Sequence, residues 1–228
     1  MNNKVRMIAK SFDKTIELSH QGINQYMHLP EYITNNPQFD KYQAMQTCSE
    51  SDSGNQKIYE FLKPSIEKKF IDLGCCLNLI NRGYAEWESK YYGIDISKEV
   101  IGELERYIAE RKIVVGALVL GDMGETFFEN DFFDIGACIG SLEYYEQKKV
   151  HSLICEFCRI LKPGGRLVLD IPYPDSEEGY ISRLVEEYLG RKDDFNMTED
   201  EFDILLHNFF EIKHKDTVDT IVYYLEKK

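Results

Sequence analysis

The sequence predicts an α/β protein whose doubly wound, mostly parallel sheet has seven strands with an antiparallel last strand, preceded by an N-terminal helical extension. Between residues 70 and 171, short apolar runs alternate with amphipathic segments, which is typical of βαβ units in a parallel sheet. The final two β-rich runs, 209–215 and 220–225, are separated by a few polar residues, which predicts a hairpin. The first 50 residues are instead compatible with amphipathic helices.

Length and composition limit the organisation of the chain. At 228 residues, 43% of them hydrophobic, it is long enough for one α/β domain with an embellishment and short for two independent domains. We therefore expect a helical extension or lid over residues 1–55 and an α/β domain over 56–228, with a helical insertion at about 177–208.

The net charge of −13 disfavours nucleic acids and anionic membrane surfaces as partners. No apolar run approaches the roughly 18 residues of a membrane span, and the N-terminus has no apolar signal core. We expect a cytoplasmic protein that binds neither nucleic acid nor membrane.

The N-terminal extension has two open interpretations. Residues 7–18 and 23–33 are compatible with amphipathic helices, the polar stretch 49–55 predicts a flexible link, and a further helix is expected to end at Pro64. The extension either packs on the sheet edge and adds stability, or forms a lid that excludes water from a ligand site.

One βαβ unit organises the domain. It consists of a strand at 70–73, a turn at 74–78, a crossover helix and a second strand at 91–95. Asp72 lies near the end of the first strand and Asp95 at the carboxyl end of the second. Open α/β sheets bind ligands at this edge, where an acid can accept hydrogen bonds from ribose hydroxyl groups. The unit therefore predicts a nucleoside ligand.

The remaining elements follow the same alternation. Ser97 caps a helix that runs to about residue 108, and β-rich runs occupy 113–120, 132–139 and 166–171. A helix over about 147–161 ends at Lys162-Pro163-Gly164-Gly165, since proline cannot continue a helix and glycine can take a left-handed cap. Thr198 and Glu201 form a capping-box pattern within the insertion.

The six cysteines do not form a secreted disulfide framework, so we expect reduced thiols. Cys155 and Cys158 have the spacing of metal ligands, but there is no second pair. They lie in a predicted helix that has an apolar stripe. Core packing is therefore the favoured interpretation over a metal or redox role, and no metal site is predicted.

Four motifs, in order, resemble those of the class I S-adenosylmethionine-dependent methyltransferases, which have a Rossmann-like fold. They are Asp72-x-Gly74, Asp95, Gly121-Asp122 and Lys162-Pro163-Gly164-Gly165, over residues 56–228. The resemblance implies that S-adenosylmethionine is the cofactor and that Asp122 and Met123 meet its adenine. The cofactor-binding residues that it implies are Asp72, Gly74, Cys75, Cys76, Asp95, Ile96, Asp122, Met123 and Ile139.

The glycine loop departs from the family pattern. Cys76 and Asn78 stand where the family usually has its second and third glycines, so the loop that meets the methionine end of the cofactor has less room. This departure either weakens cofactor binding or seats the cofactor slightly differently, and it is one reason to consider a catalytically inactive relative.

The acceptor side is less defined. Glu143 and Tyr144 follow the fourth strand, beside the expected methyl donor, and Tyr173 follows the fifth; these three residues are the expected substrate pocket, with packing and helix capping as their alternative roles. No catalytic residue is assigned, because methyl transfer from a sulfonium depends mainly on positioning.

We therefore predict methyl transfer from S-adenosylmethionine to a small-molecule acceptor. The alternative is a catalytically inactive relative that acts as a cofactor-binding or partner protein. A nicotinamide-dependent oxidoreductase is disfavoured, since the phosphate-binding glycines are absent. The sequence identifies neither the acceptor nor the oligomeric state.

Overall fold

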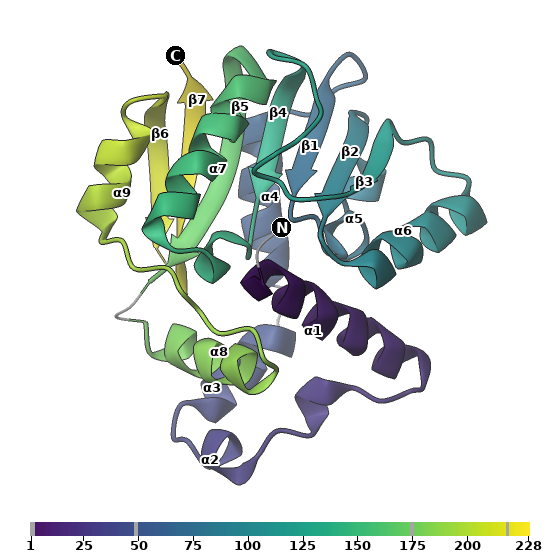
Figure 1. Cartoon of the computed structure of the whole chain (residues 1–228), viewed down its shortest axis with the longest axis vertical. Helices are drawn as coiled ribbons and strands as arrows, with labels where there is room; N and C mark the ends of the chain where they lie inside the picture. The colour runs from purple at the N-terminus through teal and green to yellow at the C-terminus, as the bar shows by residue number, and fades with distance from the viewer. Residues whose placement is uncertain (1–2, 48–49, 174–175, 218) are drawn as a thin grey trace.

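A computed structural model of the protein describes residues 3–47, 50–173, 176–217 and 219–228 (Figure 1). Its centre is a seven-stranded sheet of order β3-β2-β1-β4-β5-β7-β6. The strands are β1 (Lys69–Leu73), β2 (Lys90–Asp95), β3 (Ala117–Leu120), β4 (Phe133–Cys138), β5 (Leu161–Pro172), β6 (Phe210–Thr217) and β7 (Thr220–Lys227).

The strand directions agree with the sequence prediction. β1 pairs in parallel with β2 and β4, as do β2 with β3 and β4 with β5, whereas β7 runs antiparallel to both β5 and β6. The chain moves outward from β1 to β3 and then returns to β4 on the other side of β1. This reversal is the topological switch point at which open α/β sheets bind ligands.

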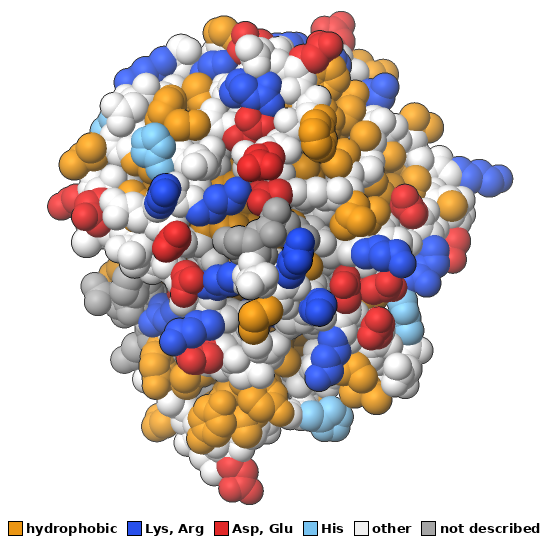
Figure 2. Space-filling view, viewed as in Figure 1, with side chains coloured by type: hydrophobic (Ala, Val, Ile, Leu, Met, Phe, Trp, Pro, Cys, Tyr) orange, Lys and Arg blue, Asp and Glu red, His pale blue; other side chains and the backbone are white. Residues whose placement is uncertain are grey.

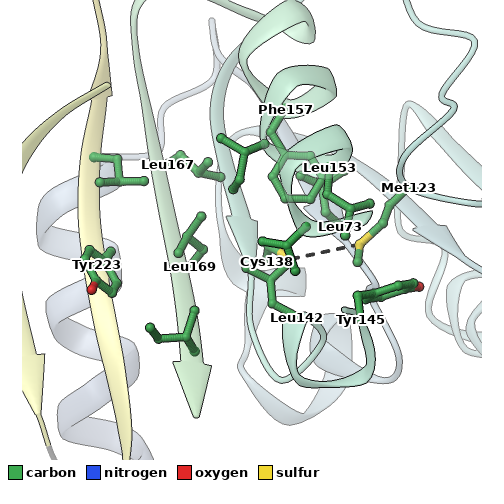
Figure 3. Close-up of a cluster of buried hydrophobic side chains, with 14 of the residues drawn as sticks. Leu73, Met123, Cys138, Leu142, Tyr145, Leu153, Phe157, Leu167, Leu169 and Tyr223 are labelled. Atoms are coloured by element: carbon green, nitrogen blue, oxygen red, sulfur yellow. Dashed lines mark hydrogen bonds between the residues drawn. The ribbon is translucent and has the colours of Figure 1, made fainter. Parts of the chain in front are cut away.

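Helices cover both faces of the sheet. Buried side chains of α4 (Glu50–Leu62), α5 (Asn78–Asn81) and α6 (Lys98–Arg111) pack on one face, and those of α7 (Gln147–Ile160) and α9 (Glu199–Leu206) on the other. Figure 3 shows Leu153 and Phe157 of α7 beside Leu167 and Leu169 of β5. The central strands β1, β2, β4 and the later part of β5 are nearly continuous in apolar residues because both faces of the sheet are buried there.

A third group of helices lies beyond the carboxyl ends of the strands (Figure 1). It comprises α1 (Asn3–His20), η1 (Gln25–Met27), α2 (Glu31–Thr34), α3 (Phe39–Thr47) and α8 (Glu177–Tyr188). Ile33 and Tyr42 form a small separate cluster with Ile181 and Val185. The N-terminal segment therefore packs against the helical insertion as well as against the sheet domain.

Several predicted boundaries are wrong. The polar stretch 49–55 is expected to be a flexible link, but α4 begins at Glu50; Ser49 lies outside the described residues. Ser, Asp and Asn weaken a helix without forbidding it, and even Gly54 costs only about 1 kcal/mol relative to alanine. The expected β-run 113–120 is a strand only from Ala117, and the segment 23–33 is broken into η1 and the short α2.

The crossover between β1 and β2 also differs from the prediction of a full helix. It contains one turn of α-helix, α5, and a 3-10 turn, η2 (Tyr84–Glu86), separated by Gly83 at φ +69°. The buried Tyr84 ring and Trp87 pack edge-on or tilted against Phe70. Large aromatic rings thus cover this part of the sheet in place of further helical turns.

The Lys162-Pro163-Gly164-Gly165 segment is a turn within β5 rather than a helix cap. Helix α7 ends at Ile160, and its C-cap residue Leu161 is already extended. The register with β4 jumps from Phe133–Leu161 to Ile135–Arg166, and the left-handed residue between is Gly164 at φ +73°. Glycine is needed here for a bulge in the strand, four residues beyond the helix end.

Surface and cysteine features complete the fold. On the face shown in Figure 2, basic side chains are interspersed with acidic ones. Among the described residues, no helix is both long and apolar enough to cross a membrane. The five described cysteines are unpaired; Cys158 packs against the core, whereas Cys155 is half-buried and lies outside that cluster.

Candidate functional site

A cleft opens at the switch point, where the carboxyl ends of β1, β2 and β4 meet. We term it the switch-point cleft; the space between its lining atoms, part of it open to solvent, is about 420 Å³. It is lined by Phe12, Gly74, Cys76, Ile94, Asp95, Ile96, Gly121, Met123, Gly140, Ser141, Tyr144 and Tyr145.

The turn after β1 forms the floor of the cleft. Gly74 has φ +70°, and a Cβ atom there would lie 2.2 Å from Ser141 Oγ. The amides of Gly74 and Cys75 both donate to the carbonyl oxygen of Ile94, at 3.0 Å each. Only glycine permits this conformation together with so close an approach of the segment after β4.

The two cysteines of the turn have different surroundings. Cys75 is fully buried and faces the core, whereas Cys76 lines the cleft. Cys76 has φ +37°, a conformation that side chains rarely adopt, and its amide donates to Asp95 Oδ2 at 2.8 Å. Burial raises the pKa of the Cys76 thiol to about 12, so it stays protonated at neutral pH.

Asp95 occupies the carboxyl end of β2, as predicted, and lines the cleft. The Ser97 amide donates to Oδ1 at 2.8 Å, so each carboxylate oxygen accepts one backbone N–H. Each oxygen keeps a second lone pair that can accept a hydrogen bond from a ligand hydroxyl group. Burial raises the pKa of Asp95, and the bonds from Ser97 and Cys76 oppose that rise.

Asp72 lies behind the turn and does not line the cleft. It is fully buried; Tyr91 Oη donates to its Oδ2 at 3.0 Å, and the Asn78 side-chain amide to Oδ1 at 3.4 Å. Burial raises its pKa to about 7. Its contacts with Tyr91 and Asn78 tie the turn to β2, and direct contact with a ligand stays a prediction.

The other expected cofactor-binding residues divide in the same way. Ile96 and Met123 line the cleft, whereas Ile139 packs in the core beneath it. Asp122 accepts the Gly124 amide at 2.8 Å through Oδ1 and pairs with Lys149 at 3.1 Å through Oδ2. With these partners, its carboxylate lies outside the lining of the cleft. Its hydrogen bond to adenine stays a prediction.

A second cavity adjoins the first. We term it the β5 pocket; the space between its lining atoms, part of it open to solvent, is about 540 Å³, and it shares Gly140 and Tyr144 with the switch-point cleft. All three expected substrate residues, Glu143, Tyr144 and Tyr173, line it. The other lining residues are Gly140, Asp170, Ile171, Pro172, Gly179, Ser182, Arg183, Glu186, Arg191, Asp193, Asp219 and Thr220.

Asp170 was not predicted from the sequence, although its position near the end of a strand could have indicated it. It lies near the carboxyl end of β5, the same kind of position as Asp95, and its Oδ1 accepts the Gly140 amide at 2.8 Å. Burial raises its pKa to about 6. Burial and the nearby charges of Asp170 and Glu186 raise the pKa of Glu143 well above its usual range.

Arg191, from the loop after α8, was also missed. Its side chain is 1% exposed, its Nε donates to Ser11 Oγ at 3.1 Å, and its Nη2 donates to Thr15 Oγ1 at 2.8 Å. The guanidinium lies 4.1 Å from the centre of the Phe12 ring. Because Ser11, Thr15 and Phe12 belong to α1, Arg191 fixes α1 against the insertion.

The same guanidinium reaches the β5 pocket. Its Nη1 lies 3.1 Å from Glu186 Oε2 and donates to Tyr26 Oη at 3.3 Å. Tyr144 Oη donates to Glu186 at 3.3 Å. A connected polar group therefore joins the N-terminal segment to the wall between the two cavities, and no sequence signal foretold a contact across 180 residues.

A second contact holds α1 at the start of α6. Asp13 Oδ1 accepts the Ser97 hydroxyl at 2.7 Å and the Glu99 amide at 3.1 Å. A carboxylate is favourable at this helix N-terminus, where backbone N–H groups lack helical partners. Phe12, the preceding residue, is thereby placed in the wall of the switch-point cleft.

Comparisons with known proteins agree with this architecture. Residues 71–169 match the family model of a methyltransferase domain. The chain is 30% identical over 109 residues to the ubiquinone biosynthesis O-methyltransferase of Dechloromonas aromatica, covering 45% of this chain and 43% of that protein. The chain spans about half the length of the curated relatives it matches.

Solved structures share the fold across more of the chain. Magnesium protoporphyrin IX methyltransferase from Synechocystis, with bound S-adenosylhomocysteine, has a TM-score of 0.65 at 15% identity and covers 99% of this chain and 100% of its own. Geranyl diphosphate C-methyltransferase from Streptomyces coelicolor has a TM-score of 0.64 at 13% identity, covering 78% of this chain and 76% of its own. Residues 71–169 therefore match a methyltransferase domain, and the chain as a whole shares the fold of these methyltransferase structures.

Proposed function

We propose that the protein transfers a methyl group from S-adenosylmethionine to a small-molecule acceptor. The cofactor occupies the switch-point cleft and the acceptor occupies the β5 pocket. The observation that carries this proposal is that the two cavities meet at Gly140 and Tyr144, so a sulfonium methyl group and a nucleophile can face each other there. Alignment of this kind can supply about 7–11 kcal/mol of the barrier reduction.

The residues of the cleft fit the cofactor. The free lone pairs of Asp95 suit the ribose hydroxyls. Because Gly74 has no side chain, the turn presents its backbone to the methionine end of the cofactor. Met123 and Ile96 supply apolar walls suited to a purine ring. Bound there, S-adenosylmethionine supplies an activated methyl group, and the surrounding side chains orient the acceptor and exclude water.

Binding calorimetry with S-adenosylmethionine and S-adenosylhomocysteine tests this proposal on the native protein and on Asp95→Asn. Hydrogen bonds to charged groups contribute about 1.5–3 kcal/mol each, so we expect affinity to fall at least tenfold in the variant. Asp200→Asn, on the exposed side of α9, is the matched control and should bind normally. Failure of the native protein to bind either compound would favour the inactive-relative alternative.

We further infer that the described part of the N-terminal extension, residues 3–47, acts as a lid. Phe12 lines the cofactor cleft, and both Asp13 and Arg191 hold α1 over it, so a large ligand requires α1 to move. Amide hydrogen exchange along α1, with and without S-adenosylhomocysteine, should show added protection when ligand is bound. Equal exchange in both states would favour the purely stabilising role. The unpaired cysteines suit the reducing cytoplasm, which we propose as the location.

A further inference from the structure

The β5 pocket carries more acidic than basic side chains. Five carboxylates line it, from Glu143, Asp170, Glu186, Asp193 and Asp219, against the guanidinium groups of Arg183 and Arg191. A pocket that receives a neutral apolar acceptor has no need of this excess, and one that receives an anion would be hindered by it. The charges therefore bear on the class of acceptor.

The two arginines are already engaged. Arg191 pairs with Glu186 at 3.1 Å and donates to hydroxyl groups of the N-terminal segment. Arg183 donates to the carbonyl oxygen of Tyr173 at 3.5 Å, and its charge acts on Asp193. Within the described part of the chain, no Lys or Arg nitrogen lies within 4.0 Å of the carboxylates of Glu143 or Asp170.

Glu143 is placed where the two cavities meet. It follows β4 directly, and its Oε1 lies 3.9 Å from the position of a Cβ built on Gly140, a residue that lines both cavities. Asp170, which is 6% exposed, accepts a hydrogen bond from the amide of the same Gly140. Burial, and after it the negative charges of Asp170, Glu186 and Asp193, raise the pKa of Glu143, which makes this carboxylate a stronger proton acceptor.

Building on the proposed function, we propose that the acceptor is a small primary or secondary amine, bound as its ammonium ion, and that Glu143 is the catalytic base that removes its proton. The ammonium ion is a cationic partner for the carboxylates of the pocket, which outnumber its guanidinium groups. The rings of Tyr144 and Tyr173 in the same wall suit a cation as well.

The reaction balances with the groups present. A proton moves from the ammonium nitrogen to a Glu143 carboxylate oxygen, which leaves a neutral amine with a free lone pair. That lone pair forms the new N–C bond to the methyl group, while the C–S bond breaks and its electron pair stays on sulfur. The products are the methylated ammonium ion and S-adenosylhomocysteine, and Glu143 later releases the proton to solvent.

Matched probes distinguish an ammonium acceptor from other classes. Phenethylamine, 2-phenylethanol and phenylacetate form one series, and butylamine, 1-butanol and butyrate a second. Each is titrated by calorimetry into protein saturated with S-adenosylhomocysteine, and each is assayed for methyl transfer from labelled S-adenosylmethionine. We expect the amine of at least one series to bind tenfold or more tightly than its alcohol and to be methylated, and the carboxylates not to bind.

The outcomes separate this proposal from the one on which it rests. Equal or tighter binding of an alcohol or carboxylate overturns the amine proposal, as does the absence of amine binding by a protein that binds S-adenosylhomocysteine. A protein that does not bind S-adenosylhomocysteine refutes the proposed function itself.

Glu143→Gln tests the base directly, since it keeps the shape of the side chain but removes its charge and basicity. We expect its affinity for S-adenosylhomocysteine to stay within twofold of the native value, which shows that the cleft is intact. Turnover of the amine should fall by about 100-fold or more, the usual effect of losing a general base. Glu187→Gln, an exposed neighbour on α8, is the control and should leave both unchanged. Turnover by Glu143→Gln within threefold of the native rate overturns the assignment.

Discussion

Replacing Arg191 with methionine tests whether this buried cation holds the N-terminal helix in place. Its guanidinium is paired with Glu186 at 3.1 Å and hydrogen-bonded to Ser11, Thr15 and Tyr26. Methionine has a similar length but no charge, so Glu186 would lose its cationic partner in a largely buried position and keep only hydroxyl donors such as Tyr144. Removing one partner of a buried ion pair costs about 3–5 kcal/mol, and we expect that loss in the free energy of unfolding.

Arg191→Lys separates charge from geometry. Lysine keeps the positive charge but cannot present the planar fork that reaches Ser11, Thr15 and Tyr26 together. Each lost hydrogen bond to a hydroxyl contributes about 1 kcal/mol, so we expect a loss of about 1–3 kcal/mol, smaller than that of the methionine variant. Adding Glu186→Gln to Arg191→Met should restore part of the stability, because the unpaired charge is then removed.

Urea denaturation measures the global effect, and amide hydrogen exchange over α1 measures the local one. We expect both variants to increase exchange in α1. Lys192→Met, whose side chain is 70% exposed, is the adjacent control and should change neither readout. A loss below about 1 kcal/mol in Arg191→Met, with native exchange in α1, would refute the view that Arg191 anchors this helix.

Three further changes test the turn after β1, the loop before the last part of β5 and the buried acid. Burial raises the pKa of Asp72 to about 7 in the folded protein, against about 3.9 in the unfolded chain, so its contribution to the free energy of unfolding falls as pH rises from about 4 to 7. Urea titrations at several pH values should show that Asp72→Asn flattens this decline. Parallel stability–pH profiles of the native protein and the variant would contradict this expectation. Cys76→Gly removes a Cβ at φ +37°, a strain of about 1–2 kcal/mol, and opens the cleft; we expect calorimetry to show tighter binding of S-adenosylmethionine. Gly165→Ala places a Cβ 2.7 Å from the Lys162 carbonyl oxygen and should lower the melting temperature more than Gly164→Ala, which has open space but φ +73°; the reverse order would contradict the geometry.

The sheet was predictable because both of its faces are buried. Apolar runs such as 70–73, 91–95 and 132–139 leave few alternatives to a parallel strand, and the hairpin at 209–225 indicates the antiparallel end. Local signals failed where tertiary packing decides the outcome. The crossover after β1 has a positive-φ glycine and large rings in place of helical turns, and α4 extends through polar residues that propensity alone would leave in a link.

The candidate site divides along the same line. Strand ends are readable in a sequence, so Asp95, Glu143 and Tyr173 could be predicted at the carboxyl edge, and Asp170 satisfies the same rule although it was overlooked. Side-chain direction is not readable; Asp72 and Asp122 lie at the expected positions but bond within the protein. Nothing local in the sequence indicates that Phe12 and Arg191 meet, because that contact depends on how α1 and the insertion pack.

Cys76 bears on whether the altered glycine loop disables the site. A non-glycine residue with positive φ persists only where its surroundings determine it, and such residues concentrate at functional sites. Here the Gly74 and Cys75 amides are fixed on Ile94, and the Cys76 amide is fixed on Asp95, so the loop keeps a glycine-like path at the cost of strain. That strain lies beside Asp95 in the wall of the switch-point cleft, which favours a working cofactor site. In such a site the cysteine changes the room available rather than the backbone that meets the cofactor.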